Sequence, residues 1–103
     1  VRTRPCGMAC ILIEWDEPEN GLALHYNVYA SPRREFACDH NTIVGSPREP
    51  RFFDSGIPHE GLRYSPPVRF YCVTAVSGWG QESKPSDVTE GRAGLPNIYR
   101  DWE

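Results

Sequence analysis

Residues 68–76, VRFYCVTAV, constrain the fold of this chain more than any other segment. Their β-branched and aromatic side chains favour the extended backbone of a β-strand. Successive side chains of a strand point to opposite faces, so Tyr71, Val73 and Ala75 share one face. The segment therefore predicts a strand that packs this face into a hydrophobic core.

Two earlier segments repeat the pattern. In residues 10–15, Ile11, Ile13 and Trp15 alternate with the side chains between them, as a half-buried strand requires. Residues 23–31 read as a second strand, which Pro32 should end because proline cannot donate to a ladder. The expected core consists of Ile11, Ile13, Trp15, Tyr26, Val28, Tyr71, Val73 and Ala75.

The remaining strand signals are shorter. Residues 51–56 predict a short strand that ends in an Asp-Ser-Gly turn. Weak edge strands are expected at 36–38 and at 42–44, and 83–90 reads as a final edge strand in which Pro85 is tolerable. No window shows a helical period over three turns. At 103 residues the chain matches one all-β domain with turns at sandwich-like spacing.

The charge balance limits the classes of partner. With 11 basic and 14 acidic residues, the chain has no field that would concentrate nucleic acid. No apolar run approaches the roughly 20 residues that span a bilayer, so membrane insertion is not expected. Protein partners, neighbouring domains of a parent chain and carbohydrate stay open.

Several motifs, taken in order, resemble the fibronectin type III family. ILIEWDEP is similar to its strand B, YNVYAS to its strand C, and YCVTAVSGWGQESKPSD to strand F, the following loop and strand G; FFDSGI adds to the match. The resemblance covers about residues 10–89 and implies an immunoglobulin-like, two-sheet antiparallel sandwich of about seven strands. The domain is expected to span 1–90.

Two features depart from the family pattern. Only fourteen residues precede Trp15, so the first strand is expected to be short, cut away or replaced. The family tends to place an inward tyrosine near the start of strand F, where this chain has Arg69. Either Tyr64 supplies the missing hydrogen bond, or the corner is built differently.

Residues 91–103 form an apolar extension beyond the expected last strand. Leu95, Ile98, Tyr99 and Trp102 are too apolar for a purely solvated tail. The extension is expected to fold back on the sandwich, and the alternative is that it begins a linker or a contact surface to a neighbouring domain.

Four cysteines permit two disulfides and favour an extracellular or secreted protein. Cys6 and Cys10 are close enough to pair if the chain turns at Gly7. Cys72 should project from the outer face of its strand. If Cys38 lies on an edge strand, the strand at 23–31 separates it from Cys72, so a bridge between the two requires rearrangement of a loop. The alternative is four reduced thiols in a cytoplasmic protein.

The sequence contains no recognisable catalytic constellation. His25, His40 and His59 fall on a strand start and in two loops, without a serine or cysteine in a nucleophile motif. The cysteine spacing is only marginally compatible with a structural zinc site. We therefore expect no enzyme activity, cofactor or metal.

Trp79 is the main candidate contact residue. It lies between two glycines in the loop after the 68–76 strand, where sandwich domains often build contacts. Its alternative role is a packing lid over the sheet edge. Tyr29 and Phe70 are expected on the same sheet and would extend Trp79 into a patch.

The sequence thus favours a non-catalytic protein-interaction or spacer module of a larger, multidomain protein. Two alternatives are an accessory domain of a carbohydrate-active enzyme, carbohydrate-binding or structural, and an intracellular adaptor with free thiols. Fold alone does not choose among them.

Overall fold

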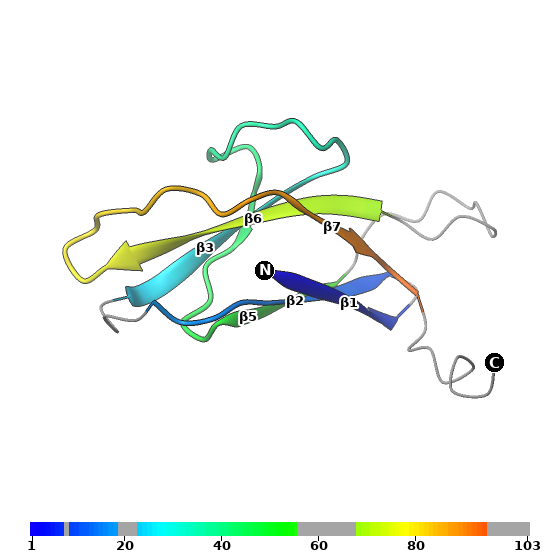
Figure 1. Cartoon of the computed structure of the whole chain (residues 1–103), viewed down its shortest axis with the longest axis horizontal. Helices are drawn as coiled ribbons and strands as arrows, with labels where there is room; N and C mark the ends of the chain where they lie inside the picture. The colour runs from blue at the N-terminus through cyan, green and yellow to red at the C-terminus, as the bar shows by residue number, and fades with distance from the viewer. Residues whose placement is uncertain (8, 19–22, 56–67, 95–103) are drawn as a thin grey trace.

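The computed structural model of the chain describes residues 1–7, 9–18, 23–55 and 68–94 (Figure 1). These residues form seven strands in two antiparallel sheets that pack face to face, which confirms the predicted all-β sandwich. The strands are β1 (Arg2–Gly7), β2 (Cys10–Glu14), β3 (Ala23–Ser31), β4 (Ile43–Gly45), β5 (Arg51–Ser55), β6 (Val68–Ser77) and β7 (Thr89–Arg92).

The first sheet has the strand order β1-β2-β5. β2 is central, and its residues Cys10 to Glu14 pair antiparallel with β5. β1 pairs antiparallel with β2, and Arg2 lies opposite Glu14. The register shifts between Pro5 and Gly7. A first strand is therefore present before the Trp15 strand, and Pro5 lies at the edge of the sheet, where a missing N–H group is tolerated.

The second sheet has the order β4-β3-β6-β7. Its centre is the long antiparallel pair of β3 and β6, in which Ala23 lies opposite Ser77 and Ser31 opposite Phe70. β4 adds a short edge, and β7 pairs with the first residues of β6, where Arg92 lies opposite Val68.

The core lies between the two sheets, on the alternating faces of β2, β3 and β6. Trp15 and Tyr26 meet edge to face across it, with ring centroids 5.2 Å apart. Ala75 is only partly buried against this cluster. The buried members are Ile11, Ile13, Trp15, Tyr26, Val28, Ala30, Tyr71, Val73 and Ala93.

Two of the short strands differ from their predicted positions. Residues 36–38 form no strand, and the edge strand follows only at β4. The last strand begins at Thr89, not at residue 83, and continues to Arg92. The expected domain boundary after residue 90 thus lies inside β7, and Ala93 beyond it is buried in the core. The remainder of the extension, 95–103, lies outside the described residues.

The segment before β7 follows β6 without forming a regular ladder. Ser83 donates its backbone N–H to the Ala75 carbonyl, and its Oγ accepts the Ala75 N–H. Ser86 does the same with Val73. The two serines lie on either side of Pro85, which has no N–H group. Their hydroxyls accept the N–H groups of β6 that backbone carbonyls would accept in a regular ladder. The regular strand therefore begins only at Thr89.

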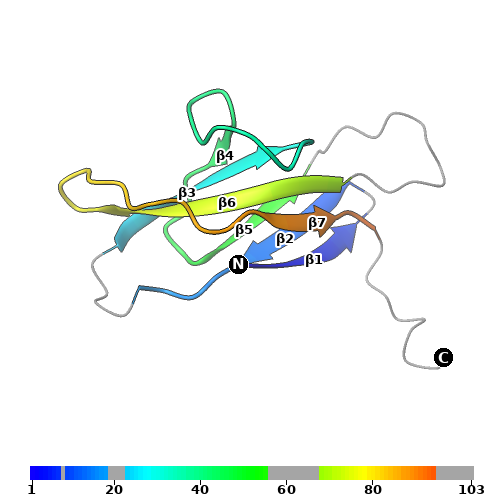
Figure 2. The same ribbon diagram turned by 45° about the horizontal axis from the view of Figure 1, so that its top comes forward.

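β1 and β7 join the two sheets along one side of the sandwich (Figure 2). Thr3 Oγ1 donates to the Glu90 carbonyl at 2.8 Å, and the Gly94 N–H donates to the Gly7 carbonyl at 2.7 Å. β7 approaches the core closely at Gly91, where an added Cβ would lie 2.9 Å from atoms of Ile11 and Tyr71. A glycine is needed there for close packing.

Candidate functional site

The loop after β6 presents Trp79 to solvent. The Gly80 N–H donates to the Ser77 carbonyl and the Ser77 N–H donates to the Gln81 carbonyl, which makes a tight turn. Gly80 has a φ of 85°, a conformation that glycine adopts without strain. The turn leaves the Trp79 side chain 73% exposed, so Trp79 is not a packing lid over the sheet edge.

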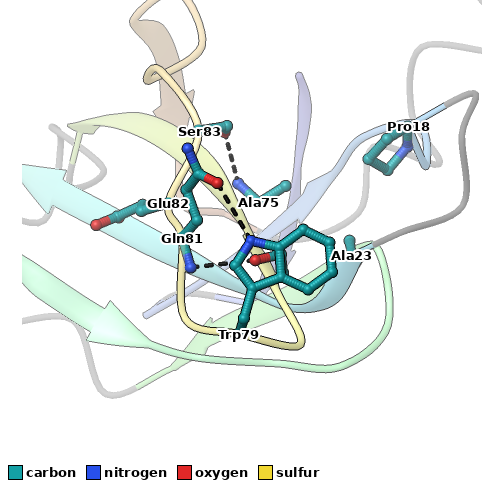
Figure 3. A pocket seen from close by; sticks show the side chains of 8 residues that line it. Pro18, Ala23, Ala75, Trp79, Gln81, Glu82 and Ser83 are labelled. Atoms are coloured by element: carbon teal, nitrogen blue, oxygen red, sulfur yellow. Dashed lines mark hydrogen bonds between the residues drawn. The ribbon is translucent and has the colours of Figure 1, made fainter.

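Beside Trp79 lies an open cleft of about 440 Å³. Figure 3 shows the indole ring on one side of this cleft, with Pro18 and Ala23 on the other. Small and apolar side chains make up most of the lining, and Ala75 and Ser83 contribute from β6 and the segment that follows it. We call this feature the Trp79 cleft.

The indole is held in place by its own loop. Trp79 Nε1 donates to Gln81 Oε1 at 3.2 Å, and the Gln81 N–H donates to Ser77 Oγ at 3.1 Å (Figure 3). An exposed aromatic ring that is already oriented loses less conformational entropy when a ligand packs on it. The loop thus presents a preorganised apolar surface.

Glu82 anchors this loop to the outer face of the second sheet. Its Oε2 accepts hydrogen bonds from Thr74 Oγ1, from the Tyr29 hydroxyl and from Asn27 Nδ2. These bonds, that of Thr74 first and that of Tyr29 second, lower the pKa of the Glu82 carboxyl, because they favour its charged form. The loop that carries Trp79 is therefore attached to β3 and β6 by a carboxylate.

Tyr29 and Phe70 do not extend Trp79 into one patch. Tyr29 is buried, its hydroxyl is bonded to Glu82, and burial followed by that bond raises its pKa. Phe70 lies opposite Ser31, at the end of β6 remote from Trp79, and the Arg34 guanidinium covers its ring at 4.9 Å. Of the three predicted contact residues, Trp79 alone is strongly exposed.

All four cysteines are paired, Cys6 with Cys10 and Cys38 with Cys72. Cys72 lies opposite Tyr29 on the face of β6 that does not join the core cluster, as its position between Tyr71 and Val73 indicates. Because residues 36–38 form no edge strand, the loop after β3 is free to bring Cys38 to Cys72. A disulfide sulfur is not a thiolate, so neither pair offers a nucleophile.

The sequence did not predict the charged cluster that joins the two sheets at Asp54. Asp54 on β5 is buried, and its Oδ2 accepts a hydrogen bond from the Tyr71 hydroxyl at 2.6 Å and one from Arg69 NH1 at 3.1 Å. Burial, and then the Asp54 bond, raises the pKa of Tyr71. Arg69, which stands where the family pattern has a tyrosine, thus contacts Asp54; the other candidate for this corner, Tyr64, lies outside the described residues.

The histidines and acidic residues form no further site in the described part of the chain. His25 lies on β3 opposite Val76, His40 is exposed in a loop, and His59 lies outside the described residues. Among the described residues, no three His, Cys, Asp or Glu side chains are grouped so that they could hold a metal ion.

The fold and its surface define a class, a two-sheet antiparallel β-sandwich that carries two disulfides and an exposed tryptophan cleft. No protein-family model matches the chain, and no curated protein matches it. In the described ranges, no helix has the length and apolar character to cross a membrane. The two disulfides indicate an oxidising environment.

Proposed function

We propose that the chain is a fibronectin type III module that acts without catalysis, as an interaction or spacer unit of a larger, extracellular multidomain protein. The observation that carries the proposal is the distribution of the strands whose sequences resemble that family. The strand-B-like segment, β2, lies in one sheet, and the segments like strands C and F pair in the other as β3 and β6. The segment like strand G runs beside β6 through Ser83 and Ser86 and leads into β7 of the same sheet. Immunoglobulin-like sandwiches divide their strands in this way.

The path of the chain suits a spacer. β1 starts opposite Glu14, and Thr3 near its start bonds to Glu90 of β7, so the N-terminus lies about midway along the longest axis of the molecule (Figure 1). β7 ends opposite Val68, at the end of β6 remote from Trp79, and Gly94 beyond it bonds to Gly7 at the end of β1. The start of β1 and the end of β7 therefore lie apart along the strand direction, an arrangement that is compatible with a neighbouring domain on either side.

The exposed surface suits an interaction. Trp79 is among the residue types that dominate binding energies, and it stands at the tip of an anchored loop. The pairing of all four cysteines favours a secreted module over an intracellular adaptor with free thiols.

Replacement in the parent protein tests the proposal. Deleting the module should reduce localisation or binding of the parent while leaving any separate active site competent. Substituting an unrelated sandwich of similar size separates the two roles, because it should restore the function of a spacer and not that of a binding surface. Undiminished localisation and binding by the deleted parent would count against both roles.

A further inference from the structure

We propose that the Trp79 cleft binds a neutral oligosaccharide, with the indole of Trp79 stacked on the apolar C–H face of a pyranose ring. This inference rests on the proposed interaction function and names the ligand class of that surface. It follows from the shape of the cleft, from its charge and from the hydrogen-bonding groups that its loop leaves available.

The shape fits a flat, rigid ligand. The cleft is open, with a volume of about 440 Å³, and its main apolar surface is one exposed indole facing Pro18 and Ala23 (Figure 3). An open surface of this kind does not enclose a compact apolar molecule. A sugar ring, which has one apolar face and a polar rim, packs on such a ring while its hydroxyls stay in water.

The charge around the cleft selects a neutral sugar. Among the described residues, Glu82 is the one charged residue in the lining, and its carboxylate points away from the indole, towards Tyr29 and Thr74 (Figure 3). No arginine, lysine or histidine in the part of the chain that the structure describes contributes to the lining. A uronic acid or a sulfated sugar would therefore meet no cation from these residues, whereas neutral hydroxyls need none.

Three N–H groups of the loop are not available to an extended peptide. The N–H groups of Ser77, Gly80 and Gln81 are all bonded within the loop. Peptides that add to a sheet obtain their affinity from free main-chain groups, so this edge of the cleft offers them little.

One side-chain group completes the site for a sugar. Gln81 uses its Oε1 to accept the Trp79 indole N–H. The same geometry turns the amide so that its NH₂ group, a double donor, does not take part in that bond. The amide stands at the edge of the indole, and its NH₂ group points away from the ring (Figure 3), where it can donate to a hydroxyl of a sugar unit that extends past this edge.

The test is a titration of the whole chain with soluble neutral hexasaccharides of glucose, mannose and xylose, followed by NMR through the indole N–H resonance of Trp79 and, in all variants, through the backbone amide resonances of the loop. We expect at least one neutral hexasaccharide to shift this resonance. Trp79→Ala should weaken binding about tenfold or more, and Gln81→Ala by less. Phe53→Ala, which removes another exposed aromatic side chain on the other sheet, should leave binding unchanged.

Each other outcome overturns the inference. The inference is wrong if no resonance shifts at millimolar sugar, or if Trp79→Ala binds the sugar as the wild type does. It is also wrong if oligogalacturonate or a proline hexapeptide gives a stronger response than the neutral sugars. A parent protein with Trp79→Ala that still binds and localises, while the deleted parent does not, would refute the sugar site and leave the proposed module function standing.

Discussion

The hydroxyl of Tyr71 lies 2.6 Å from the Asp54 carboxylate, which joins β6 of one sheet to β5 of the other. Tyr71 is fully buried and Asp54 is nearly so, and Arg69 completes the cluster. A charge in this position is stable because it is paired and hydrogen-bonded. The cluster contributes a polar, directional contact to an interface that is otherwise apolar.

Tyr71→Phe should lower the free energy of unfolding by about 2 kcal/mol, because hydrogen bonds to charged groups are among the stronger ones. Urea denaturation measures the change. A double-mutant cycle with Asp54→Asn isolates the contact, and its coupling energy should be about 1 kcal/mol or more. Strictly additive effects of the two substitutions would mean that the bond contributes nothing.

The Glu82 network should make stability depend on acid pH. The folded-state pKa of Glu82 lies below its ordinary value of 4.5, so its contribution is complete above about pH 4.5 and is lost as pH falls through the lower, folded-state pKa. Unfolding of wild type and Glu82→Gln, followed from pH 6 to pH 2, should show the smaller acid dependence in the variant. Glu49→Gln, which removes an exposed carboxylate paired with Arg51, is the matched control and should follow the wild type.

The two disulfides should differ in their contribution to stability. Cys38–Cys72 closes a loop with a sequence separation of 34, against 4 for Cys6–Cys10. Chain entropy predicts losses of about 4 and about 2 kcal/mol when each pair is replaced by alanine. Urea denaturation of the two double variants compares them.

The pairing of the four cysteines can be measured directly. Alkylation of the unfolded chain without reductant should label no cysteine, and alkylation after reduction should label all four. Four labelled cysteines without reductant would contradict the pairing and revive the intracellular adaptor.

Gly91→Ala should destabilise the sandwich by about 1–3 kcal/mol, because the new methyl group would crowd Ile11 and Tyr71 in the core. Gly78→Ala is the matched control, since nothing lies within 4 Å of its added Cβ. Thermal and urea unfolding of both variants should separate them, and equal stability of the two would mean that β7 does not approach the core as described.

The sequence by itself determined β2, β3, β5 and β6 and the main part of the core. Alternation in the segments around Ile11, Val28 and Val73 is a local property, because the period of two places every second side chain on one face whatever the partner strand. The turn residues that end these segments also act locally, through their own backbone restrictions. For this reason β3 and the all-β class followed from the sequence directly.

Tertiary structure decided what depends on a second segment. The Tyr29 hydroxyl donates to Glu82, which is distant in sequence, and Cys72 pairs with Cys38 because a loop without a strand reaches it. β7 begins at Thr89 because Ser83 and Ser86 use their side chains on β6. The Trp79 cleft exists because the turn at Gly80 and the bond to Gln81 orient the indole. The sequence left open whether this indole is exposed or packs over the sheet edge.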